Sequence, residues 1–154
     1  AVVGRYINKS TLEIKFSIDT IMAKGDALHM NLNYKEAITC YDKAIEKDPE
    51  HESAFSNKGN TLRGMRKYKE SIEYLKRAIE IDPTDFYNVD MQSQTYREWG
   101  KYEKALEINE QMLKKFPDDK ESIYQSFIEI YQGMNDQNKV EEYKEKLQKL
   151  RDLK

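Results

Sequence analysis

The chain has 154 residues, of which 38% are hydrophobic and 35% are charged, and its formal net charge is -2. This length fits one domain with a hydrophobic core, and the composition excludes wholesale disorder. Because the net charge is small and negative, we expect no nucleic-acid partner. No apolar run approaches the roughly 20 residues that cross a bilayer, so we expect no membrane insertion. The single cysteine, Cys40, predicts a reducing compartment, the cytoplasm.

Residues 1–17 lack the periodicity of the remaining chain. In "TLEIKF" (residues 11–16), apolar and charged side chains alternate, which favours an extended segment. The alternative is a remnant helix from an upstream repeat, in which Val3, Ile7 and Ser10 share a column. If it is extended, this N-terminal arm can lie against the repeats of its own chain or of a neighbour.

From residue 18 onward the sequence repeats with a period of 34 residues. The only three prolines, Pro49, Pro83 and Pro117, lie at this spacing. The same period relates small and aromatic residues: Gly25 and Gly59; Ala44 and Ala78; Tyr34, Tyr68 and Tyr102. A fixed period of this length is typical of stacked structural repeats.

Each repeat contains two segments with helical spacing. Small and apolar residues stand at i, i+4 and i+7: Ile21, Gly25 and Leu28 in one segment, Ala37, Tyr41 and Ala44 in the next. A glycine inside a helix costs about 1 kcal/mol relative to alanine, so the glycines predict close approach of a neighbouring helix. Proline cannot continue a helix and should end the second segment, and the following "TD" and "DD" should cap the next helix.

These residues resemble the tetratricopeptide repeat family. The first repeat carries nearly every signature position of that family: Gly25, Tyr34, Ala37, Tyr41, Ala44 and Pro49. The resemblance implies an all-α, right-handed superhelical solenoid of helix–turn–helix repeats with about seven or eight helices. We place three repeats at residues 18–51, 52–85 and 86–119.

Residues 120–154 form a degenerate fourth repeat that ends in a capping helix. Lys139 and Lys146 occupy positions that are small in earlier repeats. Long charged side chains there should prevent a further repeat from docking, so we expect a monomer. Self-association through the N-terminal arm is the alternative, and a coiled coil through the last helix is disfavoured because its apolar stripe is short.

No group of residues in the sequence indicates catalysis. His29 and His51 have no cysteine at metal-ligand spacing, and neither a calcium loop nor a phosphate loop is present. We therefore expect no cofactor, no metal ion and no enzyme activity. The leading hypothesis is a non-catalytic module for protein–protein interaction. The alternatives are a self-assembling scaffold and a regulatory module of a larger enzyme.

The resemblance implies that the first helix of each repeat lines a concave groove that binds a partner peptide or protein segment. The residues carried over to this groove are Met22, Asp26, His29, Asn57, Asn60, Arg63, Tyr87, Met91, Gln94, Arg97, Tyr124, Gln125 and Ile128. Carboxamides such as Asn57 and Asn60 can hold a peptide main chain, while Tyr87 and Tyr124 can contact its side chains.

Charges in the groove limit the partner. Arg63 and Arg97 favour an acidic residue in the bound segment. Chaperone-binding members of the family hold a terminal carboxylate with a clamp whose matching positions here are Met22, Asp26, Asn57, Tyr87 and Met91. Only Asn57 keeps a clamp residue, and Asp26 would repel a carboxylate, so we expect no binding of heat-shock chaperone tails by such a clamp.

Overall fold

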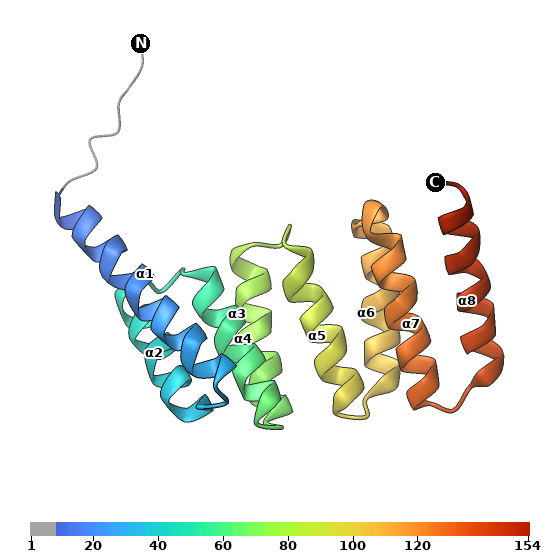
Figure 1. Ribbon diagram of the computed structural model, residues 1–154, viewed down its shortest axis with the longest axis horizontal. Helices are drawn as coiled ribbons and strands as arrows, with labels where there is room; N and C mark the ends of the chain where they lie inside the picture. Colours follow the sequence, from blue (N-terminus) through green and yellow to red (C-terminus); the bar gives the residue numbers. More distant parts are fainter. Residues whose placement is uncertain (1–8) are drawn as a thin grey trace, which may run out of the picture.

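The computed structural model describes residues 9–154, which form eight α-helices that follow one another in chain order along the long axis of the molecule (Figure 1). Their bounds are α1 (Lys9–Met30), α2 (Tyr34–Lys47), α3 (Glu52–Gly64), α4 (Tyr68–Ile81), α5 (Phe86–Glu98), α6 (Tyr102–Lys115), α7 (Lys120–Gly133) and α8 (Gln137–Asp152). A short 3-10 turn, η1 (Pro117–Asp119), joins α6 to α7. No strand occurs within residues 9–154. The predicted all-α solenoid of seven or eight helices is confirmed.

The helices form two layers. Each odd-numbered helix packs against the even-numbered helix that follows it, and α1, α3, α5 and α7 also contact one another in sequence. Among the described elements, no even-numbered helix contacts another even-numbered helix. Because the odd-numbered helices stand closer together, they form the inner layer of a curved stack. The concave side is the face of the odd-numbered helices that points away from the even-numbered helices. The convex side is the opposite face, formed by the even-numbered helices.

Small residues allow the two layers to approach closely. A Cβ atom added at Gly25 would lie 2.7 Å from Tyr41 Cε1, and one at Gly59 would lie 2.8 Å from Leu75 Cγ. Ala78, in α4, is completely buried. The predicted close approach at the two glycines is confirmed, and it explains why helical positions that disfavour glycine carry it.

The loops after the even-numbered helices follow the prolines. Each proline lies two residues beyond the last residue of α2, α4 or α6, as predicted. Asp85 caps α5, since its Oδ1 accepts a hydrogen bond of 2.9 Å from the backbone N–H of Tyr87. The predicted cap by "DD" is wrong: Asp118 and Asp119 belong to η1, and neither side chain caps α7.

The extended arm predicted for residues 1–17 is wrong for residues 9–17, which are the first part of α1. Extending an existing helix adds one hydrogen bond per residue without a new nucleus, and the described residues offer no strand to pair with. The alternating side chains are consequently left on the surface, with Leu12 51% and Phe16 76% exposed. Residues 1–8 lie outside the described part of the chain. They include Val3 and Ile7 of the predicted remnant helix.

The last helix, α8, covers α7 with one face. Val140 and Leu147 are buried against it, at 2% and 5% exposure. Lys139 and Lys146 remain accessible and each forms a 2.7 Å ion pair with Glu142. Hydrogen bonds from these two ammonium groups lower the pKa of the Glu142 carboxyl to about 2. The polar outer face fits the predicted cap, while the monomeric state stays a prediction.

Candidate binding surface on the concave side

The residues predicted to line a groove all lie on the odd-numbered helices of the inner layer. Met22, Met91 and Ile128 are buried, with at most 8% of their surface exposed, so they offer a partner almost no contact area. The other ten are half-buried or exposed. The structure therefore retains these ten as candidates for contact with a partner.

At the N-terminal end of the concave side, Asp26 joins α1 to its neighbours. Its Oδ1 accepts hydrogen bonds of 2.8 Å from both Tyr41 Oη and Asn57 Nδ2. Burial, reinforced by this carboxylate, raises the pKa of the Tyr41 hydroxyl. A pocket of about 230 Å³ lies here, lined by Asp26, His29, Met30, Tyr41, Asn57 and Asn60. Within residues 9–154, Asp26 forms no ion pair with a lysine or arginine.

His29 is held by a hydrogen bond across the same two helices. Its Nδ1 lies 2.8 Å from Thr61 Oγ1, and the Thr61 hydroxyl also lies 2.8 Å from the carbonyl oxygen of Asn57. Because the hydroxyl donates its one hydrogen to that carbonyl, the imidazole N–H is the donor to Thr61. His29 is thus fixed as part of the wall of the pocket.

Arg63 reaches from α3 to α5. Its Nη1 donates hydrogen bonds of 2.9 Å to Gln94 Oε1 and Glu98 Oε1, and its Nη2 donates one of 2.9 Å to Asn60 Oδ1. The guanidinium group is therefore engaged with a carboxylate and two amides of the chain itself.

Arg97 makes the corresponding contact one repeat later. Its Nη1 lies 2.6 Å from Glu129 Oε2 on α7, in a partly buried ion pair. Arg63 and Arg97 are both paired with carboxylates of the chain itself. The structure therefore gives no support to the predicted preference for an acidic residue, which stays untested.

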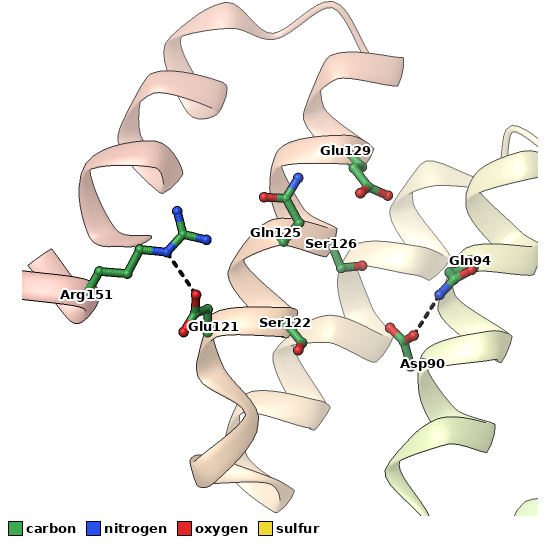
Figure 2. Close-up of a pocket in the computed structure, with 8 residues that line it drawn as sticks. All are labelled: Asp90, Gln94, Glu121, Ser122, Gln125, Ser126, Glu129 and Arg151. Atoms are coloured by element: carbon green, nitrogen blue, oxygen red, sulfur yellow. Dashed lines mark hydrogen bonds and ion pairs between the residues drawn. The ribbon is translucent and has the colours of Figure 1, made fainter. Parts of the chain in front are cut away.

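A larger pocket, of about 450 Å³, lies between α5 and α7 (Figure 2). It is lined by Asp90, Gln94, Glu121, Ser122, Gln125, Ser126, Glu129 and Arg151. Glu121 forms 2.8 Å ion pairs with Arg151 and Lys154, and Glu129 is paired with Arg97. Asp90 has no cationic partner within residues 9–154 and accepts a 2.6 Å hydrogen bond from Gln94 Nε2.

Two polar groups in this pocket are placed to contact a ligand. Burial raises the pKa of the Asp90 carboxyl and the nearby Glu129 adds to this, while the hydrogen bond from Gln94 and the charges of Arg97 and Arg63 oppose it. Ser126 is a buried residue, 8% exposed, whose hydroxyl oxygen still reaches the surface of the pocket. Figure 2 shows this hydroxyl pointing from α7 into the gap toward α5. A ligand with hydrogen-bond donors and positive charge would satisfy both groups.

The two predicted aromatic contacts differ. Tyr87 is 45% exposed and lies three residues before Asp90, on the same face of α5. Tyr124 is half-buried and packs edge-on against Tyr143 of α8, with ring centroids 5.8 Å apart. Tyr87 is therefore the aromatic side chain that a partner can reach.

A family model described as "Psidin, N-terminal TPR repeats region" matches residues 26–152. The chain belongs to this tetratricopeptide repeat (TPR) family. No curated protein is similar enough in sequence to count as a match.

Solved structures share the fold of this TPR protein. MamA 41-end from Desulfovibrio magneticus RS-1 superposes with a TM-score of 0.75 at 21% identity, covering 89% of this chain and 77% of that chain. The TPR2B domain of yeast Sti1, in a structure with pHsp70, superposes with a TM-score of 0.70 at 20% identity, covering 76% of this chain and 98% of that chain. At these identities the likeness shows the fold alone.

The sequence analysis did not identify several residues that line the 450 Å³ pocket between α5 and α7. Asp90 lies three residues after Tyr87 and four before Gln94, so the helical period places it on the predicted face. Glu129 stands four residues after Gln125 and could have been found in the same way. Ser126 has no such signal, because its place at the pocket is visible only once the helices are packed.

No group of three or more His, Cys, Asp or Glu side chains within residues 9–154 is placed to hold a metal ion. None of the helices in this part of the chain combines the length and the apolar character that crossing a membrane requires. Cys40 is buried, at 7% exposure, as expected for a structural thiol.

Proposed function

We propose that this TPR protein is a non-catalytic interaction module that binds an extended segment of a partner protein along its concave side. Membership of the TPR family supports a role in protein interaction. The observation that carries the proposal is the 450 Å³ pocket between α5 and α7, in which Asp90 has no cationic partner. A pocket that holds a carboxylate without an ion-pair partner among residues 9–154 is a more specific site for a ligand than a uniformly solvated surface.

The bound segment carries a basic residue. Asp26 and Asp90 are concave-side carboxylates that form no ion pair within residues 9–154, whereas Arg63 and Arg97 are each paired with a glutamate of the chain. An arginine or lysine of the partner can therefore pair with Asp90 without displacing an existing ion pair. The same charges disfavour an acidic chaperone tail, which would meet the Asp26 carboxylate.

The surroundings of Asp90 also fit a guanidinium group. Ser126 offers a hydroxyl oxygen as a second acceptor, and Tyr87 offers an exposed aromatic ring on the same helix face. Arginine stacks on such rings and donates several hydrogen bonds in one plane. An arginine is therefore favoured over a lysine.

Amides elsewhere on the concave side can hold the main chain of the segment. Asn57 donates its Nδ2 to Asp26, and Asn60 accepts at its Oδ1 from Arg63. This leaves Asn57 Oδ1 and Asn60 Nδ2 as one acceptor and one donor for a peptide backbone. Since ordering a flexible segment offsets much of the contact energy, we expect micromolar affinity, about 6–8 kcal/mol.

A peptide array tests this proposal. Each sequence is displayed with Arg, Lys, Gln or Glu at its central position and probed with wild type and with the Asn57→Ala, Tyr87→Ala variant. We expect wild type to retain basic peptides and the variant to lose them. Asn138→Ala, Leu153→Ala removes an exposed amide and an exposed apolar side chain on and after α8, and should bind like wild type. Equal binding by the groove variant, with its folding verified, would exclude the concave site.

Self-association is the second candidate function. Leu12 and Phe16 are separated by one helical turn on α1 and are strongly exposed, at 51% and 76%. Such a surface can pack against a second copy of the chain. Sedimentation at micromolar concentration decides between the candidates: we expect a monomer. A dimer that dissociates in Leu12→Glu, Phe16→Glu but persists in Leu153→Glu would favour the scaffold.

A further inference from the structure

The convex side carries a second pocket, of about 340 Å³, between α4 and α6. It is lined by Lys69, Ile72, Glu73, Lys76, Tyr96, Trp99, Lys101 and Lys104. Ile72 of α4 and Tyr96 of α5 form the apolar floor of this pocket and are buried, at 5% and 8% exposure.

Aromatic rings are stacked at one side of the pocket. Trp99 lies between Tyr96 and Tyr68, with ring centroids 6.3 Å and 6.4 Å away, and 37% of it remains exposed. Gly100 follows with a φ of +75°, a backbone conformation that favours glycine and turns the chain sharply into α6. The stack therefore presents a rigid, partly open apolar surface.

The rim of the pocket is basic. Lys69, Lys76, Lys101 and Lys104 form no ion pair within residues 9–154. The Lys101 and Lys104 ammonium groups lie 5.6 Å from the ring centres of Trp99 and Tyr96, respectively. Glu73 is the one acidic residue in the lining. On a chain of net charge -2, this is a local concentration of unpaired positive charge.

We propose that this convex pocket binds an acidic segment of a partner protein, which places an aromatic or large apolar side chain on Ile72, Tyr96 and Trp99. The neighbouring carboxylates of the segment pair with the four rim lysines, and this pairing displaces no ion pair that is formed within residues 9–154. The apolar floor favours an aromatic or large apolar side chain, and the lysines favour negative charge. A ligand that is only negatively charged therefore contacts only part of the site.

A protein segment fits this pocket better than a nucleic acid. The phosphates of a nucleic acid are regularly spaced and are bound by an extended basic stripe. Here the lysines are confined to one pocket, and Glu107 lines the adjoining hollow beside Lys104. A phosphate backbone that continued past the pocket would meet this carboxylate.

Trp99 provides a direct readout because it is the only tryptophan in the chain. The probe is a synthetic peptide of glutamate and aspartate with one phenylalanine, titrated at low salt while Trp99 emission is recorded. We expect a saturable change in emission that weakens as salt is added. The same peptide with alanine in place of phenylalanine should bind more weakly.

Charge-reversal variants locate the site. Lys76→Glu, Lys104→Glu should weaken the probe about tenfold, a loss typical of removed and reversed surface charge pairs. The control Lys35→Glu, Lys43→Glu makes the same change of net charge at exposed positions of α2 and should bind like wild type. If the reversed variant unfolds, Lys76→Gln, Lys104→Gln replaces it, with the same direction of effect.

Three results would overturn the proposal. The first is no saturable change of Trp99 emission, and the second is equal weakening by the pocket and control variants. The third is a single-stranded oligonucleotide that perturbs Trp99 under conditions where the peptide does not, which would assign the pocket to nucleic acid. Asp90→Asn, on the opposite side, should leave the titration unchanged, so this test is independent of the concave site.

Discussion

The concave and convex sides of the solenoid carry unpaired charge of opposite sign. On the concave side, carboxylates form ion pairs with both arginines, whereas Asp26 and Asp90 form no ion pair with any cation of residues 9–154. In the convex pocket, four lysines form no ion pair with a carboxylate of residues 9–154. A net charge of -2 conceals this separation. Because each layer of helices exposes only its own outer face, the two faces can acquire different charge and different partners.

The largest effect is expected from a substitution that forces the two layers of helices apart, because both the concave and the convex surface depend on their packing. Ala78 is completely buried in α4, and Ala78→Leu should destabilise the fold by about 1–3 kcal/mol because overpacking forces side chains and backbone to shift. Chemical denaturation followed by circular dichroism measures this. Ala27→Leu, at an exposed position of α1, should change the free energy of unfolding by less than about 0.5 kcal/mol. Equal stability of the two variants would show that the layers are not closely packed.

A smaller change should affect the convex pocket alone. Gly100→Ala places a Cβ on a residue with φ +75°, which costs about 1 kcal/mol although no neighbouring atom lies within 4 Å. The turn carrying Lys101 should distort, so binding of the acidic probe falls while that of a basic peptide does not. Thermal melts and the two titrations measure these effects. Loss of both binding activities would contradict the independence of the two sides.

Arg66 provides the reverse experiment in the preceding repeat. Arg66 has a φ of +59° at the turn equivalent to that of Gly100. Arg66→Gly removes the strain of this conformation, which stabilises the fold, but it also raises the entropy of the unfolded chain, which destabilises the fold. We expect a net gain of about a few tenths of a kcal/mol in the free energy of unfolding. A loss of stability comparable to that of Gly100→Ala would contradict the assignment of strain to this turn.

The charge of Asp90 should make the concave side sensitive to pH. Burial raises the pKa of this carboxyl in the folded state, so the folded protein holds the proton more tightly than the unfolded chain. Stability supplied by the protonated form is lost as pH rises through the folded-state pKa. Asp90→Asn should therefore be more stable than wild type at neutral pH, and the difference should shrink toward acidic pH.

Denaturant titrations at several pH values measure this difference. Asp19→Asn, at an exposed position of α1, is the control for loss of a charge. A stability difference for Asp90→Asn that grows on acidification would contradict the account.

The repeat architecture was predictable because its signals lie within single helices. Gly25 and Gly59 recur at the helical positions that close packing requires, and the prolines mark the ends of even-numbered helices. Residues 9–17 were predicted to be extended because apolar and charged side chains alternate there. This alternation does not determine the conformation of the backbone. α1 continues through a segment that buries little and pairs with no strand.

The candidate site was predictable only in part, since its charges are paired between repeats. Arg63 contacts Gln94 and Glu98, and Arg97 contacts Glu129, all on the next inner helix. Contacts between successive inner helices depend on how far one helix is shifted along the other. The 34-residue period of the sequence does not specify this shift. Arginines that looked available in the sequence are thus neutralised, and the unpaired Asp90 emerges only from the packed structure.

The central claim is that Asp90 recognises a basic residue of the partner, and a double-mutant cycle tests it most directly. Calorimetric titration measures the affinity of an arginine peptide from the array, and of the same peptide with glutamine in place of arginine, for wild type and Asp90→Asn. The account predicts that the arginine contributes strongly to binding by wild type and little to binding by Asp90→Asn, with a coupling energy of about 0.5–3 kcal/mol. An arginine contribution that is the same in both proteins would contradict it.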